Sequence, residues 1–232
     1  MKCLLIKNAD VYAPQPLGIV DLLIINDKIA KIGQQLAAPQ GLDCQIFDAQ
    51  KRKVVPGYVD QHVHIIGGGG ESGPYSRTPE INLSELTKVG ITTVVGVLGT
   101  DGTSRHNESL LAKARGLTHE GITAYMLTGS YEIPLHNMTG DVRRDIILIN
   151  ECLGIGEVAL SDHRSSQPTR EELEKVLTQA RLGGMLSGKA GVVQFHMGVG
   201  KRGIDVLLAI VRERKSPPVI LSHPRQPCLP SF

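Results

Sequence analysis

Two histidines separated by a single residue are the feature of this sequence with the clearest chemical potential. They are His62 and His64. Side chains at positions i and i+2 of a strand point to the same face, so a strand ending here would present both imidazoles to one metal ion. A bare pair also fits two histidines that only hydrogen-bond their neighbours. The surroundings favour the metal site, because Pro56-Gly57 opens the stretch and a run of glycines at residues 67–70 follows it, where backbone can wrap closely around a ligand.

Other residues that suit a metal recur in the apolar stretches that we expect to be strands. His196 closes residues 192–195, His223 closes residues 219–222, and Glu157 begins a stretch of its own. Imidazole nitrogens and carboxylate oxygens are ligands that zinc accepts, and four histidines with one carboxylate could hold two ions. Each of these residues taken singly also fits a structural role. Their shared position at strand ends is what favours a common site.

The part of the chain before these residues has a different pattern from the part that holds them. Up to about Lys53, short apolar stretches are broken by turn signals such as Asn26-Asp27-Lys28, which predicts β-hairpins. From Tyr58 onward short apolar strands alternate with longer helical stretches, which predicts a parallel sheet. We therefore expect an N-terminal β-sandwich module over residues 1–55 and a β/α domain over residues 56–232.

Six strands can be predicted in the second part, and they are residues 58–64, 91–99, 123–128, 157–161, 192–197 and 219–222. Helices are predicted over residues 79–89, over residues 108–120, and from Thr169 to a stop at Gly183-Gly184. A doubly wound sheet and a TIM-type β/α barrel both satisfy this alternation. The candidate metal site favours the barrel, whose active site lies at the carboxyl ends of its strands. Because a full barrel typically needs about 250 residues, the predicted fold class is α/β with an incomplete barrel of the metal-dependent hydrolase kind.

Composition excludes several classes of partner. The sequence is 41% hydrophobic and 21% charged, with 25 basic against 23 acidic residues, and no basic cluster is interleaved with aromatic residues. We therefore expect neither nucleic acid nor a membrane as partner, but a small molecule. The four cysteines are widely separated and form no CxxC pair, so we expect no disulfide framework and a cytoplasmic protein.

These motifs resemble the isoaspartyl dipeptidase (β-aspartyl peptidase) family of the amidohydrolase superfamily. The likeness covers roughly residues 1–218, and it also includes Gly99-Thr100-Asp101, Leu127-Thr128-Gly129, residues 161–165 and residues 195–198. The pattern PGxxDxHxH at residues 56–64 indicates the superfamily alone, whereas the glycine-rich loop and residues 161–165 indicate the peptidases. The resemblance implies a homo-oligomeric enzyme that hydrolyses β-aspartyl dipeptides with a water activated by two zinc ions.

The same resemblance implies a role for each matching residue. His62 and His64 would bind the first zinc ion and His196 the second, while Glu157 occupies the place of a carboxylated lysine that bridges the two ions in family members. The residues implied to contact the substrate are Gly69, Gly70, Glu71, Thr100, Tyr131 and Arg164. Among these, the glycine loop and Glu71 would hold the ammonium group, Arg164 would bind a carboxylate, and Tyr131 would polarise the scissile carbonyl.

The last sixteen or so residues depart from the family pattern. His223 and Arg225 are candidates for the metal ligand and the arginine of a Pro-Thr-His-Val-Asn-Arg type motif, and the family's general-base aspartate has no counterpart, so we expect a C-terminally truncated chain of poor solubility. Two alternatives stay open: a related hydrolase of cyclic amides or N-acyl amino acids, and an inactive fragment that keeps part of the metal site.

Overall fold

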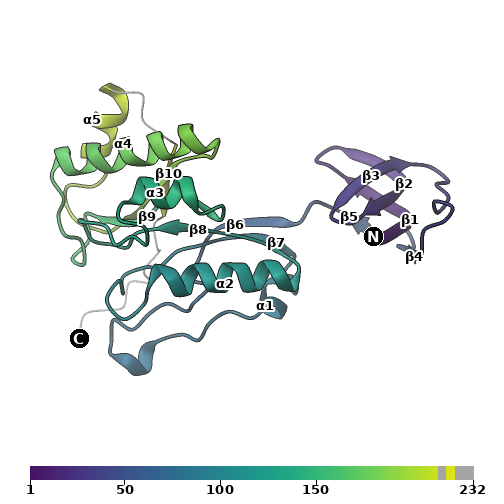
Figure 1. Cartoon of the computed structure of the whole chain (residues 1–232), viewed down its shortest axis with the longest axis horizontal. Helices are drawn as coiled ribbons and strands as arrows, with labels where there is room; N and C mark the ends of the chain where they lie inside the picture. Colours follow the sequence, from purple (N-terminus) through teal and green to yellow (C-terminus); the bar gives the residue numbers. More distant parts are fainter. Residues whose placement is uncertain (214–217, 223–232) are drawn as a thin grey trace. The chain divides into compact units, whose positions relative to one another are not determined.

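The chain folds into two compact units, which we describe from a computed structural model over residues 1–213 and 218–222 (Figure 1). One unit is Met1–Gly57 and the other begins at Tyr58. The N-terminal unit contains β1 (Cys3–Tyr12), β2 (Pro16–Ile25), β3 (Lys28–Gly33), β4 (Cys44–Asp48) and β5 (Lys53–Val54). The second unit contains β6 (Tyr58–Val63), a 3-10 helix η1 (Pro74–Ser76), α1 (Leu83–Thr87), β7 (Ile91–Gly96), α2 (Asn107–Glu120), β8 (Thr123–Thr128), α3 (Val142–Leu148), β9 (Cys152–Leu160), α4 (Arg170–Ser187), β10 (Val192–Met197), α5 (Asp205–Glu213) and β11 (Val219–Ser222).

The N-terminal unit is a five-stranded sheet with β1 at its centre. Strands β1, β2 and β3 form antiparallel hairpins, while β4 and β5 both run parallel to β1. The turn between β2 and β3 uses Asn26 with a φ of 57°, a left-handed conformation that asparagine tolerates better than most residues. The hairpins predicted from the sequence are present.

One expectation about the cysteines is wrong in this unit. The parallel register of β1 and β4 places Cys3 opposite Cys44, and the structure joins the two residues by a disulfide. The pairing was hidden from the sequence because it depends on two strands that are 41 residues apart. Cys152 is a free thiol buried in the second unit.

The second unit is built on a six-stranded parallel sheet in which the strands follow one another in the order of the chain, from β6 to β11. A doubly wound sheet reverses its strand order at a switch point, and no reversal occurs among the strands described. The sequential order is that of a barrel, so the predicted incomplete TIM-type barrel is confirmed, with β6 and β11 as its end strands.

Helices cover one face of this sheet and enclose the main core. Leu110 of α2, Ile146 of α3 and Leu173 of α4 pack with strand residues such as Met126 and Phe195 in one buried cluster. The opposite face carries a smaller apolar group that includes Val95, Leu127 and Val192. Strand residues that alternate between these two faces explain why the sequence reads as short, almost fully apolar strands.

Two helices differ from the sequence prediction. α4 does not stop at Gly183-Gly184 but continues to Ser187, and Gly188 ends it with a left-handed φ of 68°. The two glycines are there for packing, since a Cβ on Gly183 would lie 3.0 Å from Ile146 and one on Gly184 would lie 2.7 Å from Gly191. α1 is shorter than predicted and begins where Asn82 and Glu85 form a capping box.

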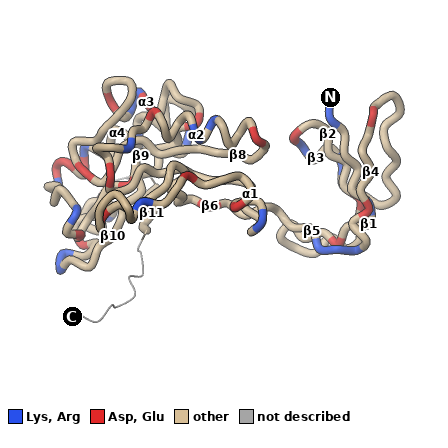
Figure 2. Tube along the Cα trace, turned by 90° about the horizontal axis from the view of Figure 1, so that it is seen from below, with Lys and Arg blue, Asp and Glu red and all other residues tan. Residues whose placement is uncertain are grey.

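The charged residues of both units are of mixed sign. Figure 2 shows Lys and Arg interspersed with Asp and Glu along the described elements. Among the described residues, no helix combines the length and the apolar composition needed to span a bilayer.

Candidate metal centre and substrate cleft

The carboxyl end of β6 brings two of the predicted metal ligands together. His62 lies within the strand and His64 directly follows it, and their ring centroids are 5.2 Å apart with the rings nearly perpendicular. His64 is held between two glycines, because a Cβ on Gly68 would lie 3.2 Å from the ring and one on Gly99 would lie 2.6 Å from it. The glycines therefore let two backbone segments close directly on this imidazole.

Glu157 lies opposite these histidines and is fully buried. The prediction placed it at the start of its strand, but β9 begins five residues earlier, at Cys152, so Glu157 lies in its second half. Sequence patterning missed the first residues of the strand because Gly154 and Gly156 interrupt the apolar run. Both glycines fit against β10, where a Cβ on Gly154 would lie 2.1 Å from the Val192 carbonyl oxygen.

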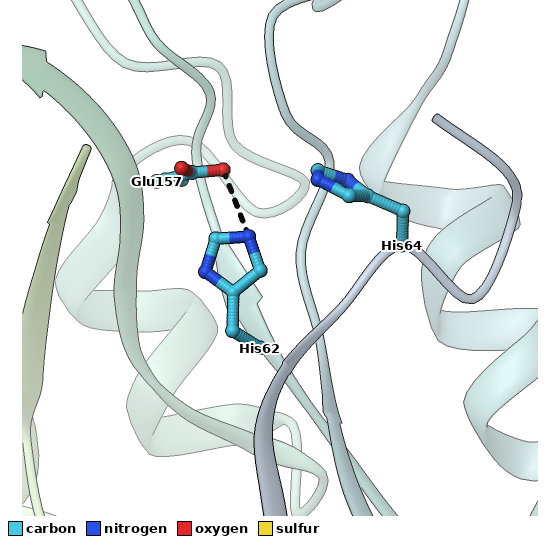
Figure 3. A group of neighbouring side chains, drawn as sticks. All are labelled: His62, His64 and Glu157. Atoms are coloured by element: carbon cyan, nitrogen blue, oxygen red, sulfur yellow. Dashed lines mark ion pairs between the residues drawn. The ribbon is translucent and has the colours of Figure 1, made fainter. Parts of the chain in front are cut away.

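His62, His64 and Glu157 form a group that fits a metal ion. Each offers one ligand atom, and these atoms lie within 4.8 Å of one another (Figure 3). Two of the buried atoms, His64 Nδ1 and Glu157 Oε2, have no hydrogen-bond partner. Glu157 Oε2 lies 3.5 Å from His62 Nε2, the contact drawn in Figure 3. Buried polar atoms without partners are costly, and a cation bound by this group would provide a partner for those of its ligand atoms that lack one.

His196, on β10, reaches the other oxygen of Glu157. Its Nδ1 lies 2.7 Å from Glu157 Oε1 and its Nε2 lies 3.0 Å from an Arg164 nitrogen. The two oxygens of the carboxylate thus face different histidines, His62 on one side and His196 on the other. Burial raises the pKa of Glu157, but the hydrogen bond from His196 and the charges of the neighbouring imidazoles lower it by more. The net pKa therefore lies below its usual range.

One residue of the site was missed from the sequence. The Gln194 amide lies 2.7 Å from His62 Nδ1, the ring nitrogen that faces away from Glu157. The amide nitrogen donates to this ring nitrogen and fixes the orientation of the ring; with a metal on Nε2, the unpartnered Gln194 Oε1 would have to take its place and accept from Nδ1–H. Gln194 is two residues before His196 on β10, so the same strand alternation that predicted His62 and His64 as a pair could have found it.

Tyr131 is buried beside the same group. Its hydroxyl lies 2.7 Å from His196 Nδ1, and its ring stacks at a tilt on the His196 ring. Burial raises the pKa of the phenol well above its usual range, and the negative charge of Glu157 adds to this rise. Tyr131 therefore keeps its proton in the neutral pH range.

A cleft of about 480 Å³ collects most of the residues predicted to contact substrate. Its lining includes Gly69, Gly70, Glu71, Thr100 and Arg164, together with Arg77 and Asp101. These residues come from three loops that are far apart in the sequence. Tyr131 does not line this cleft but is linked to it through Arg164, whose guanidinium lies 5.2 Å from the Tyr131 ring.

Arg164 is held by carboxylates on two sides. Asp162 accepts two hydrogen bonds from the guanidinium, at 2.8 and 2.9 Å, and Glu71 accepts a third at 3.1 Å. The paired guanidinium keeps the pKa of Asp162 far below its usual range. Glu71 is 43% exposed, so the pair that it forms with Arg164 is open to a ligand in the cleft.

The remaining predicted ligand, His223, and the associated Arg225 lie outside the described residues. Ser222, which precedes them, donates a hydrogen bond of 3.3 Å to Glu157 Oε1. The described part of β11 therefore ends at the candidate metal centre.

The fold and the arrangement of these residues define a class. No family model matches the chain. A dihydroorotase of Staphylococcus aureus (strain MRSA252) is 38% identical over 90 residues, 39% of this chain and 20% of the relative. An imidazolonepropionase of Photorhabdus laumondii is 28% identical over 120 residues, 50% of this chain and 29% of the relative. The fold is that of the amidohydrolase superfamily.

A closer match exists among solved structures. A β-aspartyl dipeptidase from the thermophilic, keratin-degrading Fervidobacterium islandicum AW-1 is 45% identical, with a TM-score of 0.88 over 93% of this chain and 59% of that one. The same enzyme in complex with the β-Asp-Leu dipeptide gives 44% identity and a TM-score of 0.89, over 94% of this chain and 58% of that one. The chain is a homologue of β-aspartyl dipeptidase and spans less than two thirds of its length.

Proposed function

We propose that this site hydrolyses β-aspartyl dipeptides. The observation that carries the proposal is the exposed pair of Glu71 and Arg164 in the cleft, whose guanidinium also contacts His196 beside the candidate metal centre. A β-aspartyl residue carries a free α-ammonium and a free α-carboxylate, so it is a zwitterion. When this residue enters the cleft, the ion pair between Glu71 and Arg164 is replaced by two. One joins the substrate ammonium to Glu71, and the other joins the substrate carboxylate to Arg164. The complex of the homologous enzyme with β-Asp-Leu supports the same ligand.

Among the described residues, those that would hold zinc are the convergent group of His62, His64 and Glu157, together with His196, which contacts Glu157. We propose that His62 and His64 would hold one ion and His196 a second, with Glu157 and His223 as further ligands. The support is that the two Glu157 oxygens face different histidines and that His64 Nδ1 and Glu157 Oε2 have no other partner. When bound, zinc would supply Lewis acidity and activate a hydrolytic water near neutral pH.

The protein groups have separate tasks in this proposal. Arg164, fixed by Asp162, orients the aspartyl carboxylate so that the side-chain amide is turned toward the metal ligands. Tyr131 donates its phenolic proton as a hydrogen bond to the amide oxygen, where negative charge develops. Gln194 holds the His62 ring in one orientation. The carbonyl oxygen of Gly69 already accepts from Arg105 and that of Gly70 from the Gly73 amide, so Glu71 is the principal group for the ammonium.

The proposal is tested on the purified full chain with four substrates. Bound zinc is measured per chain, and turnover is compared for β-Asp-Leu, α-Asp-Leu, N-acetyl-β-Asp-Leu and a hydantoin. We expect bound zinc and turnover of β-Asp-Leu only, because α-Asp-Leu displaces the amide and acetylation removes the ammonium charge. Turnover of the hydantoin alone would favour the cyclic-amide hydrolase, and a chain that binds no zinc and hydrolyses nothing would favour the inactive fragment.

Two further proposals concern the protein as a whole. We propose a homo-oligomer, supported by the resemblance to the peptidase family, and light scattering of the purified chain tests it. We also propose a cytoplasmic location, in which the thiols of Cys3 and Cys44 would be reduced. Alkylation of thiols in intact cells distinguishes reduced Cys3 and Cys44 from the disulfide between them.

A further inference from the structure

A buried arginine that lies outside the substrate cleft holds the glycine loop, residues 67–70, in place. This loop forms part of the wall of the cleft. Arg105 is 5% exposed, and its two terminal nitrogens donate to consecutive carbonyls, Gly68 at 2.9 Å and Gly69 at 3.1 Å. Its nearest carboxylate oxygen is that of Asp101, at 3.8 Å. Burying a guanidinium is costly unless it is well hydrogen-bonded. The hydrogen bonds that Arg105 makes here fix the position of two peptide groups.

The glycine loop needs such an external clamp. Gly67, Gly69 and Gly70 all have positive φ, and a Cβ on Gly67 or Gly69 would lie 2.2 or 2.7 Å from a backbone oxygen of residues 76–78. Only glycine fits these positions, and glycine brings no side chain to limit its own backbone freedom. The conformation is therefore set by contacts from outside the loop, of which Thr78 and Arg105 supply the side-chain hydrogen bonds to Gly68.

Both ends of this loop reach the proposed site. Gly68 packs against the His64 ring, as described above, and Glu71 directly follows the loop and pairs with Arg164. Arg105 itself makes no hydrogen bond or ion pair with His64 or Glu71 and is not among the residues that line the cleft. A shift of the two clamped peptides would move the support of a candidate metal ligand and the acceptor for the substrate ammonium together.

We propose that Arg105 is a positioning residue for the site, which acts by clamping the Gly68 and Gly69 carbonyls and so fixes the place of Glu71 relative to Arg164. The expected effect on KM rests on the proposed β-aspartyl dipeptidase function, whereas the expected effect on the conformation of the glycine loop does not. The planar fork of an arginine matches two adjacent carbonyls, and a lysine ammonium would match them less well.

The test compares Arg105→Met and Arg105→Lys with a matched control, Lys189→Met, in the full chain. Lys189 also donates to two carbonyls, those of Ile146 and Ile149, at 2.6 and 2.5 Å, but it does so at the end of α3. Three quantities are measured: amide hydrogen exchange of residues 67–73, bound zinc, and KM and kcat for β-Asp-Leu.

For Arg105→Met we expect faster exchange in residues 67–73 and a KM raised about 10- to 100-fold with a smaller change in kcat, because the ammonium acceptor is misplaced. Arg105→Lys should give intermediate values. Lys189→Met should lower the melting temperature and leave both KM and the exchange of residues 67–73 unchanged.

The proposal is overturned if Arg105→Met loses thermal stability like the control while KM and loop exchange stay at their wild-type values. If Arg105→Met does not fold, Arg105→Lys decides in the same way, since wild-type exchange and KM in that variant would contradict the clamp. If the wild-type chain itself does not hydrolyse β-Asp-Leu, the proposed function fails, and loop exchange alone then supports or overturns the role of Arg105.

Discussion

A buried carboxylate of the N-terminal unit, Asp21, and one of the second unit, Glu157, are satisfied to different degrees. In the N-terminal sheet, Asp21 accepts hydrogen bonds from the Asn8 and Leu36 amides, both at 2.9 Å, and pairs with Lys7 at 2.8 Å. In the barrel-like unit, Glu157 is buried more fully, yet its Oε2 has no hydrogen-bond partner. A buried carboxylate that the protein itself satisfies stabilises the fold, whereas one left incomplete needs a ligand to complete it.

The difference does not come from the unit in which each carboxylate lies. Asp145 is also fully buried in the second unit, and it accepts hydrogen bonds from Thr128, Met138 and Thr139. The second unit can therefore satisfy a buried carboxylate as completely as the N-terminal sheet does. The incompleteness is specific to Glu157 and coincides with the unpartnered nitrogen of His64.

The largest effect is expected for Glu157→Gln. An amide is a poor metal ligand and cannot bridge two ions, so the variant should lose bound zinc and about 1000-fold or more of its activity. Because the variant also removes the charge that His196 contacts at 2.7 Å and that gives Glu157 its lowered pKa, the metal-free variant should melt below the metal-free wild type. Metal analysis and calorimetry on metal-free protein measure both effects. Asp21→Asn is the control, and it should keep the zinc.

Tyr131→Phe should have the next largest effect. Loss of the one phenolic hydrogen bond to the developing oxyanion should lower kcat about 100-fold with little change in KM. Tyr125→Phe is a suitable control. Tyr125 lies on β8 and packs on the face of the sheet away from the helices, in the small apolar group of Val95 and Leu127. Equal kinetic losses in the two variants would show that Tyr131 acts only through packing.

The sequence predicted those parts of the site that depend on local periodicity. His62, His64 and His196 were predicted from their place at strand ends, and the structure brings each of them to Glu157. Gln194 obeys the same rule but was overlooked because glutamine is not a typical metal ligand. Arg105 could not be found in this way, since its two acceptors are 36 and 37 residues away and are backbone carbonyls, which leave no trace in side-chain chemistry.

The fold shows the same division between local and long-range information. The alternation of strands and helices was visible in the sequence, but strand order, which separates a barrel from a doubly wound sheet, depends on contacts between distant segments. The Cys3–Cys44 pairing has the same origin. Gly183-Gly184 misled the prediction because a glycine that allows close packing looks the same in sequence as one that ends a helix.

A smaller effect, on stability alone, is expected for Asp21→Asn. The variant keeps the size of the side chain but loses the charge that binds Lys7 and two backbone amides, which should cost about 2 kcal/mol of unfolding free energy. Urea unfolding followed by circular dichroism measures the loss. Lys7 is partly exposed and can be solvated, so Lys7→Met should cost less than Asp21→Asn. The reverse order would mean that the ion pair, and not the backbone amides, holds the carboxylate.

The pH dependence of the unfolding free energy lost in Asp21→Asn gives the most sensitive test of how the Asp21 carboxylate is satisfied. Burial raises the pKa of Asp21, but the hydrogen bonds from Lys7, Asn8 and Leu36 outweigh it, so the folded pKa lies below the unfolded one. Below the unfolded value of about 4, the unfolded chain binds the extra proton first, so the stabilisation is complete above that pH and is lost as the pH falls through the folded pKa. The gap in unfolding free energy between wild type and Asp21→Asn should therefore be constant from pH 7 to pH 5 and shrink below pH 4. A gap that does not change down to pH 3 would mean that Asp21 contributes through packing and not through its charge.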